Sequence, residues 1–407
     1  MLMFKGIIDT TFRDGQQSPL MFDAKKYRFS LEEKVLLTEG MLELGIQHFE
    51  FFAPNVSEIE YNDFLHLRDL IRKKNKKAQL FAHCRCHITD ITTAIEAGFD
   101  GLNLYIGVAD HSQKHSHGLS FEDIIQRVKD TVIETRKKYP NLYLRFSTED
   151  TFRTPMEKVY AIYDVLEPYV QTFGMPDTVG IATPDMVRER VVLLRKRYPN
   201  TDLECHFHND RGFSLMNAYT AVEAGVAYVD TSVWGMAERS GITSTTGFIL
   251  NYQYLNKKDC EKKYNIDLCY PLNVLMASIL NLHVPHTEPV SLTNRTHTAG
   301  VHQKAVLNDK IVYEAHDLSR FGVNKNQLLL GPLSGWNLIF YYLKEVENFD
   351  ITSEIAMEVA KEFKKRVKEI NKKITPEKLL LTIAKKFKIH RTEVPEIVSS
   401  KRLENLS

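Results

Sequence analysis

The sequence is poor in cysteine, carries almost no net charge and has no long uninterrupted apolar run. Its five cysteines are odd in number and scattered, which indicates reduced thiols and not a disulfide framework. Lys and Arg number 53 against 52 Asp and Glu, so the formal charge is +1, and this balance argues against nucleic acid as the main partner. No run approaches the roughly 18 apolar residues of a membrane span. A strand-like segment begins at Gly6, so we expect no secretory signal, no membrane partner and a cytoplasmic location.

What is present is typical of a globular enzyme. Hydrophobic residues make up 43% and charged residues 26% of the chain, which excludes a disordered protein on composition. A length of 407 residues allows two or three domains, or one large barrel with attachments.

Strand-like apolar runs alternate with amphipathic helical stretches through about residue 255. The predicted strands are Gly6–Arg13, His48–Ala53, Gln79–Arg85, Gly101–Gly107, Leu142–Thr148, Val170–Gly174, Asp202–His208 and Tyr228–Trp234. Eight strands alternating with helices over about 250 residues indicate an α/β protein of the (β/α)8, or TIM-barrel, class. A doubly wound open sheet is the alternative, but no G-x-G-x-x-G turn follows the first strand.

Helix boundaries carry recognisable signals. Ser30 with Glu33, and Ser57 with Glu60, each fit a capping box at a helix start. Three helix exits share the pattern Glu-x-Gly, in which the glycine can adopt a left-handed cap, and a polar residue follows five places later on the next strand. The three pairs are Gly45 and Glu50, Gly98 and Asn103, and Gly225 and Asp230. This echo predicts that strand ends aim polar groups into a common site.

The pattern changes after about residue 255, where mixed segments and then helices follow. We expect a catalytic barrel over residues 1–280, a mixed subdomain over 281–345 and a helical region over 346–407. The lysine-rich tract Lys361–Lys373 is interpreted as a solvated helix face.

The strongest chemical constellation is the segment from Glu204 to Asp210. Because strand side chains alternate, Glu204, His206, His208 and Asp210 are expected on one face. Two imidazoles at this spacing can both reach a divalent metal, and a nearby carboxylate would complete the set. The alternative is that these histidines only form hydrogen bonds within the strand.

The first strand runs into a glycine turn that supplies a candidate carboxylate, Asp14. Arg13, Asp14 and Gln17 would then converge at the barrel mouth, although a surface turn with an Asp cap is the simpler interpretation.

Further along, Arg145, Ser147 and Glu149 alternate onto one face. The guanidinium of Arg145 would need an anion, either a substrate carboxylate or a structural partner such as Glu149. His83 shares the inward phase of the third strand, whereas three histidines lie in a polar segment and are interpreted as surface residues: His111, His115 and His117.

The motif from Asp9 to Gln17, together with the His-x-His-Asn-Asp segment, resembles the metal-dependent lyase and synthase barrels that include isopropylmalate, citramalate and homocitrate synthases and hydroxymethylglutaryl-CoA lyase. Several stretches resemble homocitrate synthases in particular. They include His83–His87, Arg145–Asp150, Asp177–Gly180, Glu238–Thr243, His297–Leu307 and Ser334–Asn337. The resemblance covers roughly residues 6–340.

The resemblance implies a role for each matching residue. One divalent ion (zinc, manganese or magnesium) would be held by Asp14, His206 and His208. Fungal-type enzymes carry Glu where this chain has Asp14, and either carboxylate can ligate a metal. The implied 2-oxo-acid-binding residues are Arg13, Gln17, His83, Arg145, Ser147 and Thr178. Among the implied catalytic residues Arg13, Glu204 and His302, the last would be the base, supported by Glu204 and supplied by the partner subunit of a homodimer.

The implied activity is an acyltransferase reaction that condenses acetyl-CoA with a 2-oxo acid, preferably 2-oxoglutarate, to give homocitrate and free CoA. Related synthases that make citramalate, citrate or isopropylmalate are alternatives, as is lyase chemistry on a CoA thioester. A scaffold protein that has lost turnover should show broken ligands, yet Asp14, His206 and His208 are all intact.

Overall fold

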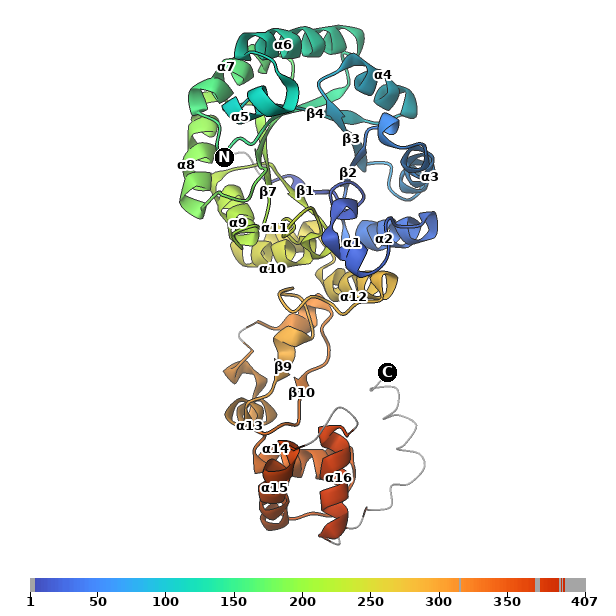
Figure 1. Cartoon of the computed structure of the whole chain (residues 1–407), viewed down its shortest axis with the longest axis vertical. Coiled ribbons are helices and arrows are strands. Elements are labelled where there is room, and N and C mark those ends of the chain that lie inside the picture. The colour runs from blue at the N-terminus through green and yellow to red at the C-terminus, as the bar shows by residue number, and fades with distance from the viewer. Residues whose placement is uncertain (1–3, 315, 370–373, 388, 390, 392–407) are drawn as a thin grey trace. The chain divides into compact units, whose positions relative to one another are not determined.

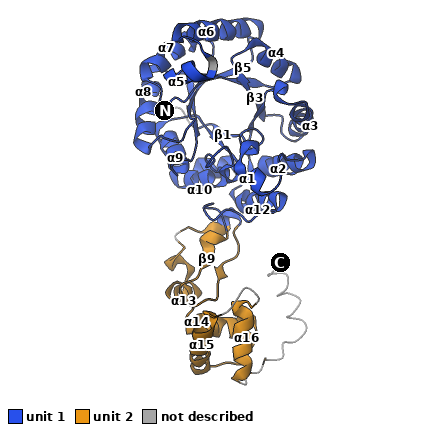
Figure 2. Cartoon of the chain, viewed as in Figure 1, with its two compact units in different colours: residues 1–291, 320–322 blue, residues 292–319, 323–407 orange. Residues whose placement is uncertain are grey.

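A computed structural model describes residues 4–314, 316–369, 374–387, 389 and 391 of the chain. It divides into two compact units, a barrel unit of residues 1–291 and 320–322 and a C-terminal unit of residues 292–319 and 323–407 (Figure 2). The boundaries predicted at residues 280 and 345 are not tested by this division and stay predictions. Among the described residues, no helix is both long and apolar enough to cross a bilayer.

The barrel unit is a closed ring of eight parallel strands in sequential order, with helices outside it (Figure 1). The strands are β1 Gly6–Asp9, β2 His48–Phe52, β3 Gln79–Arg85, β4 Gly101–Gly107, β5 Tyr143–Glu149, β6 Thr172–Asp177, β7 Asp202–Phe207 and β8 Tyr228–Thr231. β1 pairs with both β2 and β8, which closes the ring and confirms the predicted TIM barrel.

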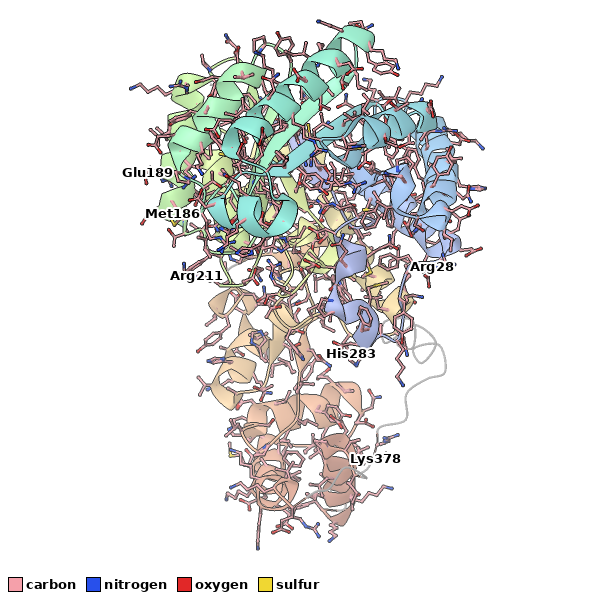
Figure 3. All side chains as sticks on the ribbon, turned by 45° about the horizontal axis from the view of Figure 1, so that its top comes forward. Arg28, Met186, Glu189, Arg211, His283 and Lys378 are labelled. Atoms are coloured by element: carbon pink, nitrogen blue, oxygen red, sulfur yellow. The ribbon has the colours of Figure 1, made fainter. Side chains whose placement is uncertain are left out.

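Helices follow the strands and cover the outside of the ring. The main ones are α2 Leu31–Leu44, α3 Glu58–Lys74, α4 Ile88–Ala97, α6 Phe121–Lys138, α7 Met156–Leu166, α8 Pro184–Arg197, α9 Ser214–Ala224 and α10 Thr245–Leu255. Shorter or later helices of this unit are α1 Pro19–Asp23, α5 Asp110–Ser112, α11 Lys257–Lys263 and α12 Cys269–Leu280. Charged side chains such as those of Arg28, Glu189 and Arg211 are exposed around this unit (Figure 3).

The inside of the barrel is layered. Side chains of Ile8, Phe81, Ala227 and Tyr228 form a small apolar cluster, with Tyr143 packed against it. Two residues further along, at the next inward-facing position, the side chains become polar: Glu50 on β2 and Asp230 on β8 are almost fully buried. The apolar layer thus closes the barrel beneath a polar layer near the carboxyl ends of the strands.

Two strands, β1 and β8, end three or more residues earlier than the sequence predicts. β1 stops at Asp9 because its carboxylate accepts hydrogen bonds from the Thr11 amide (3.0 Å) and the Thr11 hydroxyl (2.9 Å). The Thr10 carbonyl then accepts from the amides of Arg13, Asp14 and Gly15, which folds the chain into a turn. β8 stops at Thr231, before a short turn in which Trp234 has φ +62°.

The predicted helix signals are largely present. Ser30 and Glu33 form the complete capping box of α2. Ser57 caps α3 through the Glu60 amide, but the Glu60 carboxylate is drawn away to the Lys34 ammonium. Gly45, Gly98 and Gly225 all have positive φ at helix ends, as their pattern predicts.

The C-terminal unit combines a two-stranded sheet with helices. Its elements are β9 Thr296–His297, β10 Gln327–Leu328, α13 Gly300–Asn308, α14 Trp336–Tyr341, α15 Ser353–Val367 and α16 Pro376–Lys386. α15 and α16 bury a core that includes Phe363, Leu380 and Ile383. Lys361, Lys364 and Lys365 are exposed on α15, as predicted, whereas residues 370–373 of the predicted tract lie outside the described residues.

The helix cap at Gly45 gives a prediction on stability. Its φ is +108°, and a Cβ there would lie 2.2 Å from the Lys263 carbonyl oxygen, whereas at Gly225 (φ +112°) the nearest atom would be 3.6 Å away. Gly225→Ala should cost only the left-handed backbone penalty of about 1–2 kcal/mol in the free energy of unfolding. Gly45→Ala should cost clearly more in urea denaturation, and equal losses would contradict the steric argument.

Candidate metal centre and active site

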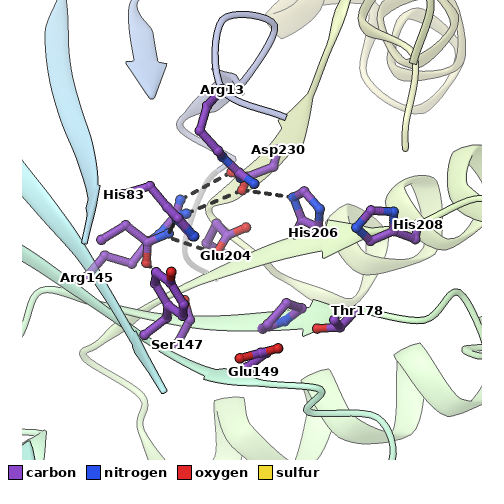
Figure 4. Close-up of a pocket in the computed structure, with 13 residues that line it drawn as sticks. Arg13, His83, Arg145, Ser147, Glu149, Thr178, Glu204, His206, His208 and Asp230 are labelled. Atoms are coloured by element: carbon purple, nitrogen blue, oxygen red, sulfur yellow. Dashed lines mark hydrogen bonds and ion pairs between the residues drawn. The ribbon is translucent and has the colours of Figure 1, made fainter. Parts of the chain in front are cut away.

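The carboxyl ends of the strands surround a cavity of about 160 Å³ (Figure 4). Most of its lining side chains are polar. The lining residues are Arg13, His83, Asn103, Tyr105, Arg145, Ser147, Glu149, Pro176, Thr178, Glu204, His206, His208 and Asp230. Every strand, or the turn directly after it, contributes to this cavity or to the buried groups that touch it, as a TIM-barrel active site requires.

Asp14, His206 and His208 form a compact group of potential metal ligands beside this cavity. All three are buried, and each offers one ligand atom within 4.8 Å of those of the other two. A carboxylate oxygen and two imidazole nitrogens suit a divalent cation. This buried group is consistent with a divalent metal site.

Local structure explains how these three side chains meet. His206 is the last inward-facing residue of β7, and Asp14 lies in the turn after β1. His208 follows the end of β7 and bridges to Ile242. The predicted alternation fails beyond it, because the strand has ended at Phe207. Asp210 is exposed and pairs with Arg239 at 2.8 Å, away from the metal-ligand group.

The unsatisfied atoms of the group support the fit to a metal ion. His208 Nδ1 is buried and has no hydrogen-bond partner among the described residues, and buried Asp14 Oδ2 has ion-pair contacts with Arg13 Nη1 (3.3 Å) and His206 Nε2 (3.2 Å) but no well-formed hydrogen bond. Such atoms are costly in a folded protein unless they serve another ligand. Burial alone would raise the pKa of Asp14, but the Arg13 guanidinium and the neighbouring imidazoles lower it, so the carboxylate stays ionised.

The two histidines have opposite electrostatic surroundings. Burial lowers the pKa of His208 to about 3, which keeps its imidazole neutral and able to ligate. Burial also opposes charge on His206, but contacts with Asp14 and Asp230 raise its pKa to about 9. His206 Nε2 lies 3.2 Å from Asp14, and its Nδ1 lies 3.2 Å from Asp230. Asp230 therefore orients the ring so that Nε2 faces Asp14.

Glu50 is the buried centre of the surrounding ion network. Its Oε1 accepts from Arg13 Nη2 at 2.8 Å, and its Oε2 accepts from Arg145 Nη2 at 2.7 Å. Asn103 Nδ2 also donates to Oε2, at 3.0 Å. Burial alone would raise the pKa of Glu50, but the two guanidinium groups hold it well below its usual range.

Arg145 has several carboxylate partners within the protein. Besides Glu50, its guanidinium lies 3.2 Å from Asp230 and 3.6 Å from Glu204. The structural pairing considered from the sequence thus exists, and its partners include Glu50 on β2, Glu204 on β7 and Asp230 on β8. Arg145 lines the cavity, and its buried Nε makes no hydrogen bond among the described residues, since its contact with Glu204 Oε2 is 3.6 Å long.

Glu204 is the carboxyl group most affected by burial. Burial raises its pKa well above the ordinary value, and the nearby charge of Asp230 adds to this although Arg145 opposes it. Burial therefore favours the protonated form of this carboxyl group more than it does for an exposed glutamate. Gly174 on β6 leaves room for it, since a Cβ there would lie 2.6 Å from Glu204 Oε2 and 2.1 Å from Ser147 Oγ.

The structure brings most of the predicted site residues together. Arg13, His83, Arg145, Ser147, Thr178, Glu204, His206 and His208 line the cavity, and Asp14 contacts two of them. His83 stacks on Tyr105 with ring centroids 4.2 Å apart. Gln17 is exposed and is not among the lining residues, and His302 belongs to the C-terminal unit.

Of the three histidines interpreted as surface residues, His111 contacts Asp150 at 2.7 Å and His115 is exposed. The His117 side chain lies outside the described part.

Three residues of the cluster received no role from sequence reasoning: Glu50, Asn103 and Asp230. The sequence signal for these three residues is the repeated Glu-x-Gly pattern. Each residue lies five places after the glycine of a left-handed helix cap, at an inward-facing position of the next strand. The Glu-x-Gly pattern predicts that the three side chains share a site, but it does not predict that they contact the arginines and His206.

Comparison with known proteins identifies the family of this chain. Residues 5–273 match the HMGL-like family, and residues 290–372 match the family described as homocitrate synthase post-HMGL domain-like. The chain belongs to the HMGL-like family. Within it, this chain groups with the homocitrate and isopropylmalate synthase-like condensation enzymes, which confirms the resemblance seen in the sequence.

Two relatives illustrate the range of this HMGL-like group. The cytosolic homocitrate synthase isozyme of Saccharomyces cerevisiae is 30% identical over 97% of this chain and 92% of its own. A 2-isopropylmalate synthase of Sediminispirochaeta smaragdinae is 28% identical over 81% of this chain and 65% of its own. The solved HMG-CoA lyase of Bacillus subtilis is 20% identical, with a TM-score of 0.57 over 70% of this chain and 97% of that chain, and shows the shared fold.

The ion network of this HMGL-like barrel predicts a pH-dependent loss of stability in Arg145→Met. Removing the guanidinium takes one of two cationic partners from buried Glu50 and Asp230, which keep Arg13 and His206 respectively, and this should cost about 3–5 kcal/mol in the free energy of unfolding at pH 7. The pKa of Glu50 is lower in the folded protein than in the unfolded chain, where it is about 4.3. The contribution of the Glu50–Arg145 pair to the free energy of unfolding is therefore complete above about pH 4.3, and it is lost as the pH falls through the pKa of the folded state. The deficit should therefore shrink below about pH 4.

The matched control is Arg188→Met, which removes an exposed ion pair with Glu223 on the outer helices. It should cost less than about 1 kcal/mol in the same urea titrations. Arg145→Met with wild-type stability at pH 7 would contradict the account of the network.

Proposed function

We propose that this protein condenses acetyl-CoA with a 2-oxo acid, most favourably 2-oxoglutarate, to form homocitrate and release CoA. The observation that carries the proposal is the buried group of Asp14, His206 and His208 beside a cavity lined by Arg13 and Arg145. Membership of the HMGL-like family and the homocitrate synthase-like second region support the same reaction class.

We propose that Asp14, His206 and His208 hold one divalent ion: zinc, manganese or magnesium. When bound, the ion would supply Lewis-acid polarisation of the 2-oxo acid's carbonyl group. The protein's own groups then bind and orient the acid. Arg13 and His83 line the cavity from β1 and β3, and the Ser147 and Thr178 hydroxyls line it from β5 and β6.

The lining favours a second carboxylate on the acceptor. Apart from Tyr105 and Pro176, the cavity residues are polar or charged. Burial raises the pKa of Glu204, which favours its protonated form as a hydrogen-bond donor, and Arg145 also lines the cavity. A branched apolar side chain, as isopropylmalate synthesis requires, would leave these groups unpaired, which is costly in a buried site.

We propose that His302 is the base that removes a proton from the methyl group of acetyl-CoA, so that the resulting carbanion equivalent attacks the keto carbon. Water then hydrolyses the thioester and frees CoA. His302 lies on α13 and stacks on Tyr313 at a centroid distance of 3.9 Å. The imidazole is exposed.

We further propose a homodimer in which His302 serves the cavity of a second copy. Around His302, the C-terminal unit exposes large apolar side chains: Val301 (74% exposed), Ile311 (72%) and Leu333 (69%). Exposed apolar groups of this kind mark protein–protein contacts. An exposed base framed by apolar side chains is the arrangement that a shared active site needs. We also propose a cytoplasmic location, in keeping with five free, buried cysteines.

A free-thiol assay of CoA release tests the reaction. Acetyl-CoA is supplied with 2-oxoglutarate, oxaloacetate, pyruvate or 2-oxoisovalerate, and the product is identified by mass. Because a charge-assisted carboxylate contact contributes about 1.5–3 kcal/mol, kcat/KM should be about 10- to 100-fold higher for 2-oxoglutarate than for 2-oxoisovalerate. Preference for 2-oxoisovalerate would assign isopropylmalate synthesis instead. No CoA release with any acceptor, but acetyl-CoA formation from hydroxymethylglutaryl-CoA, would assign a lyase.

Complementation between inactive variants tests the shared site. His302→Ala and His206→Ala chains are unfolded and refolded together in equal amounts. Random pairing makes half of the dimers mixed, and one site of each mixed dimer receives both intact groups, so about a quarter of wild-type activity should return. Mixed dimers that are proved by mass spectrometry but remain inactive would show that each chain uses its own His302.

A further inference from the structure

Lys34 places a buried ammonium group between α2 and α3, outside the cavity. Its side chain is 1% exposed, and its Nζ lies 2.8 Å from both carboxylate oxygens of Glu60 and 2.7 Å from Asp63 Oδ2. Burying a charged group costs several kcal/mol of folding free energy. Replacing a buried ion pair with apolar residues of similar volume often gives a protein that is equally stable. A buried lysine with three charged contacts therefore suggests a role in geometry more than in stability.

Gln16 connects this ion cluster to the turn that carries Asp14. Its Nε2 donates to Glu60 Oε2 at 3.0 Å and to the Phe12 carbonyl at 2.8 Å. Its Oε1 accepts from the Phe29 amide at 3.3 Å. One side chain thus ties the turn to α3 through Glu60 and to the segment before α2 through Phe29.

The turn itself is short and is held by few backbone contacts. The amides of Asp14 and Gly15 donate to Thr10, and the Gln17 amide donates to Asp14. These bonds fix the path of the chain locally but do not connect it to the helices outside the barrel. The Gln16 link supplies such a connection, two residues after Asp14.

We propose that Lys34, Glu60 and Gln16 are positioning residues for the metal centre: Lys34 fixes the Glu60 carboxylate, which holds Gln16 and thereby the Arg13–Gln17 turn, so that Asp14 faces His206 and His208. The proposal rests on the proposed function for the metal itself. Removing a residue that orients a metal ligand commonly weakens metal affinity by 10- to 100-fold.

Gln16→Ala is the decisive variant, because Gln16 is only half-buried and its loss should not prevent folding. Two readouts are needed. Hydrogen exchange measured on metal-free protein should show the amides of residues 14–17 exchanging at least about tenfold faster than in the wild type. Manganese titration should show at least a tenfold weaker affinity. Lys34→Met should shift both quantities in the same direction.

Glu39→Gln is the matched control. Glu39 on α2 pairs with Lys74 on α3 at 2.7 Å, so it links the same two helices without touching the turn. It should leave both the exchange of residues 14–17 and the manganese affinity at wild-type values.

Wild-type exchange of the turn in Gln16→Ala would overturn the proposal, as would equal loosening by Glu39→Gln. Faster exchange with unchanged manganese affinity would also overturn it, since the turn would then move without affecting Asp14. A wild-type protein that binds no divalent ion would contradict the proposed metal-dependent function, and not the positioning role of Gln16. The exchange measurement still decides whether Gln16 holds the turn.

Discussion

The buried carboxylate of Glu50, held between Arg13 and Arg145, is the interaction on which the active site depends. Both guanidinium groups come from other strands or turns, and neither would be tolerated in the barrel without an anion. Glu50 neutralises them in part, and Asp230 shares the task with Arg145 while orienting His206. One network thus anchors the two arginines that line the cavity and orients His206 of the candidate metal-ligand group.

The surroundings also move the pKa values of the acidic groups in opposite directions. Adjacent cations lower the pKa values of Glu50 and Asp14, whereas burial raises the pKa of Glu204 well above its ordinary value. Carboxyl groups whose pKa values are pushed apart in this way suit different roles, such as holding a cation or exchanging a proton. The proposed condensation uses both properties within one cavity.

Much of this fold could be predicted because strand–helix repeats leave strong periodic signals. The eight strands, the left-handed caps at Gly45, Gly98 and Gly225, and the convergence of His206 and His208 with Asp14 follow from pattern alone. The end of β1 could not be predicted, because hydrogen bonds from Thr11 to the Asp9 carboxylate turn the chain there. β7 ends at Phe207, one residue before its predicted end. Asp210 accordingly leaves the face that strict alternation predicts. The pairing of Arg145 with Glu50 joins residues 95 positions apart, and no sequence spacing reveals it.

Anomalous diffraction from crystals grown with manganese tests the central claim most directly. The account predicts one strong manganese peak per chain, in contact with Asp14, His206 and His208. Crystals of His208→Ala should lack this peak while keeping the Glu50–Arg13–Arg145 network. A wild-type structure with manganese bound elsewhere, or with no manganese near these three side chains, would contradict the account.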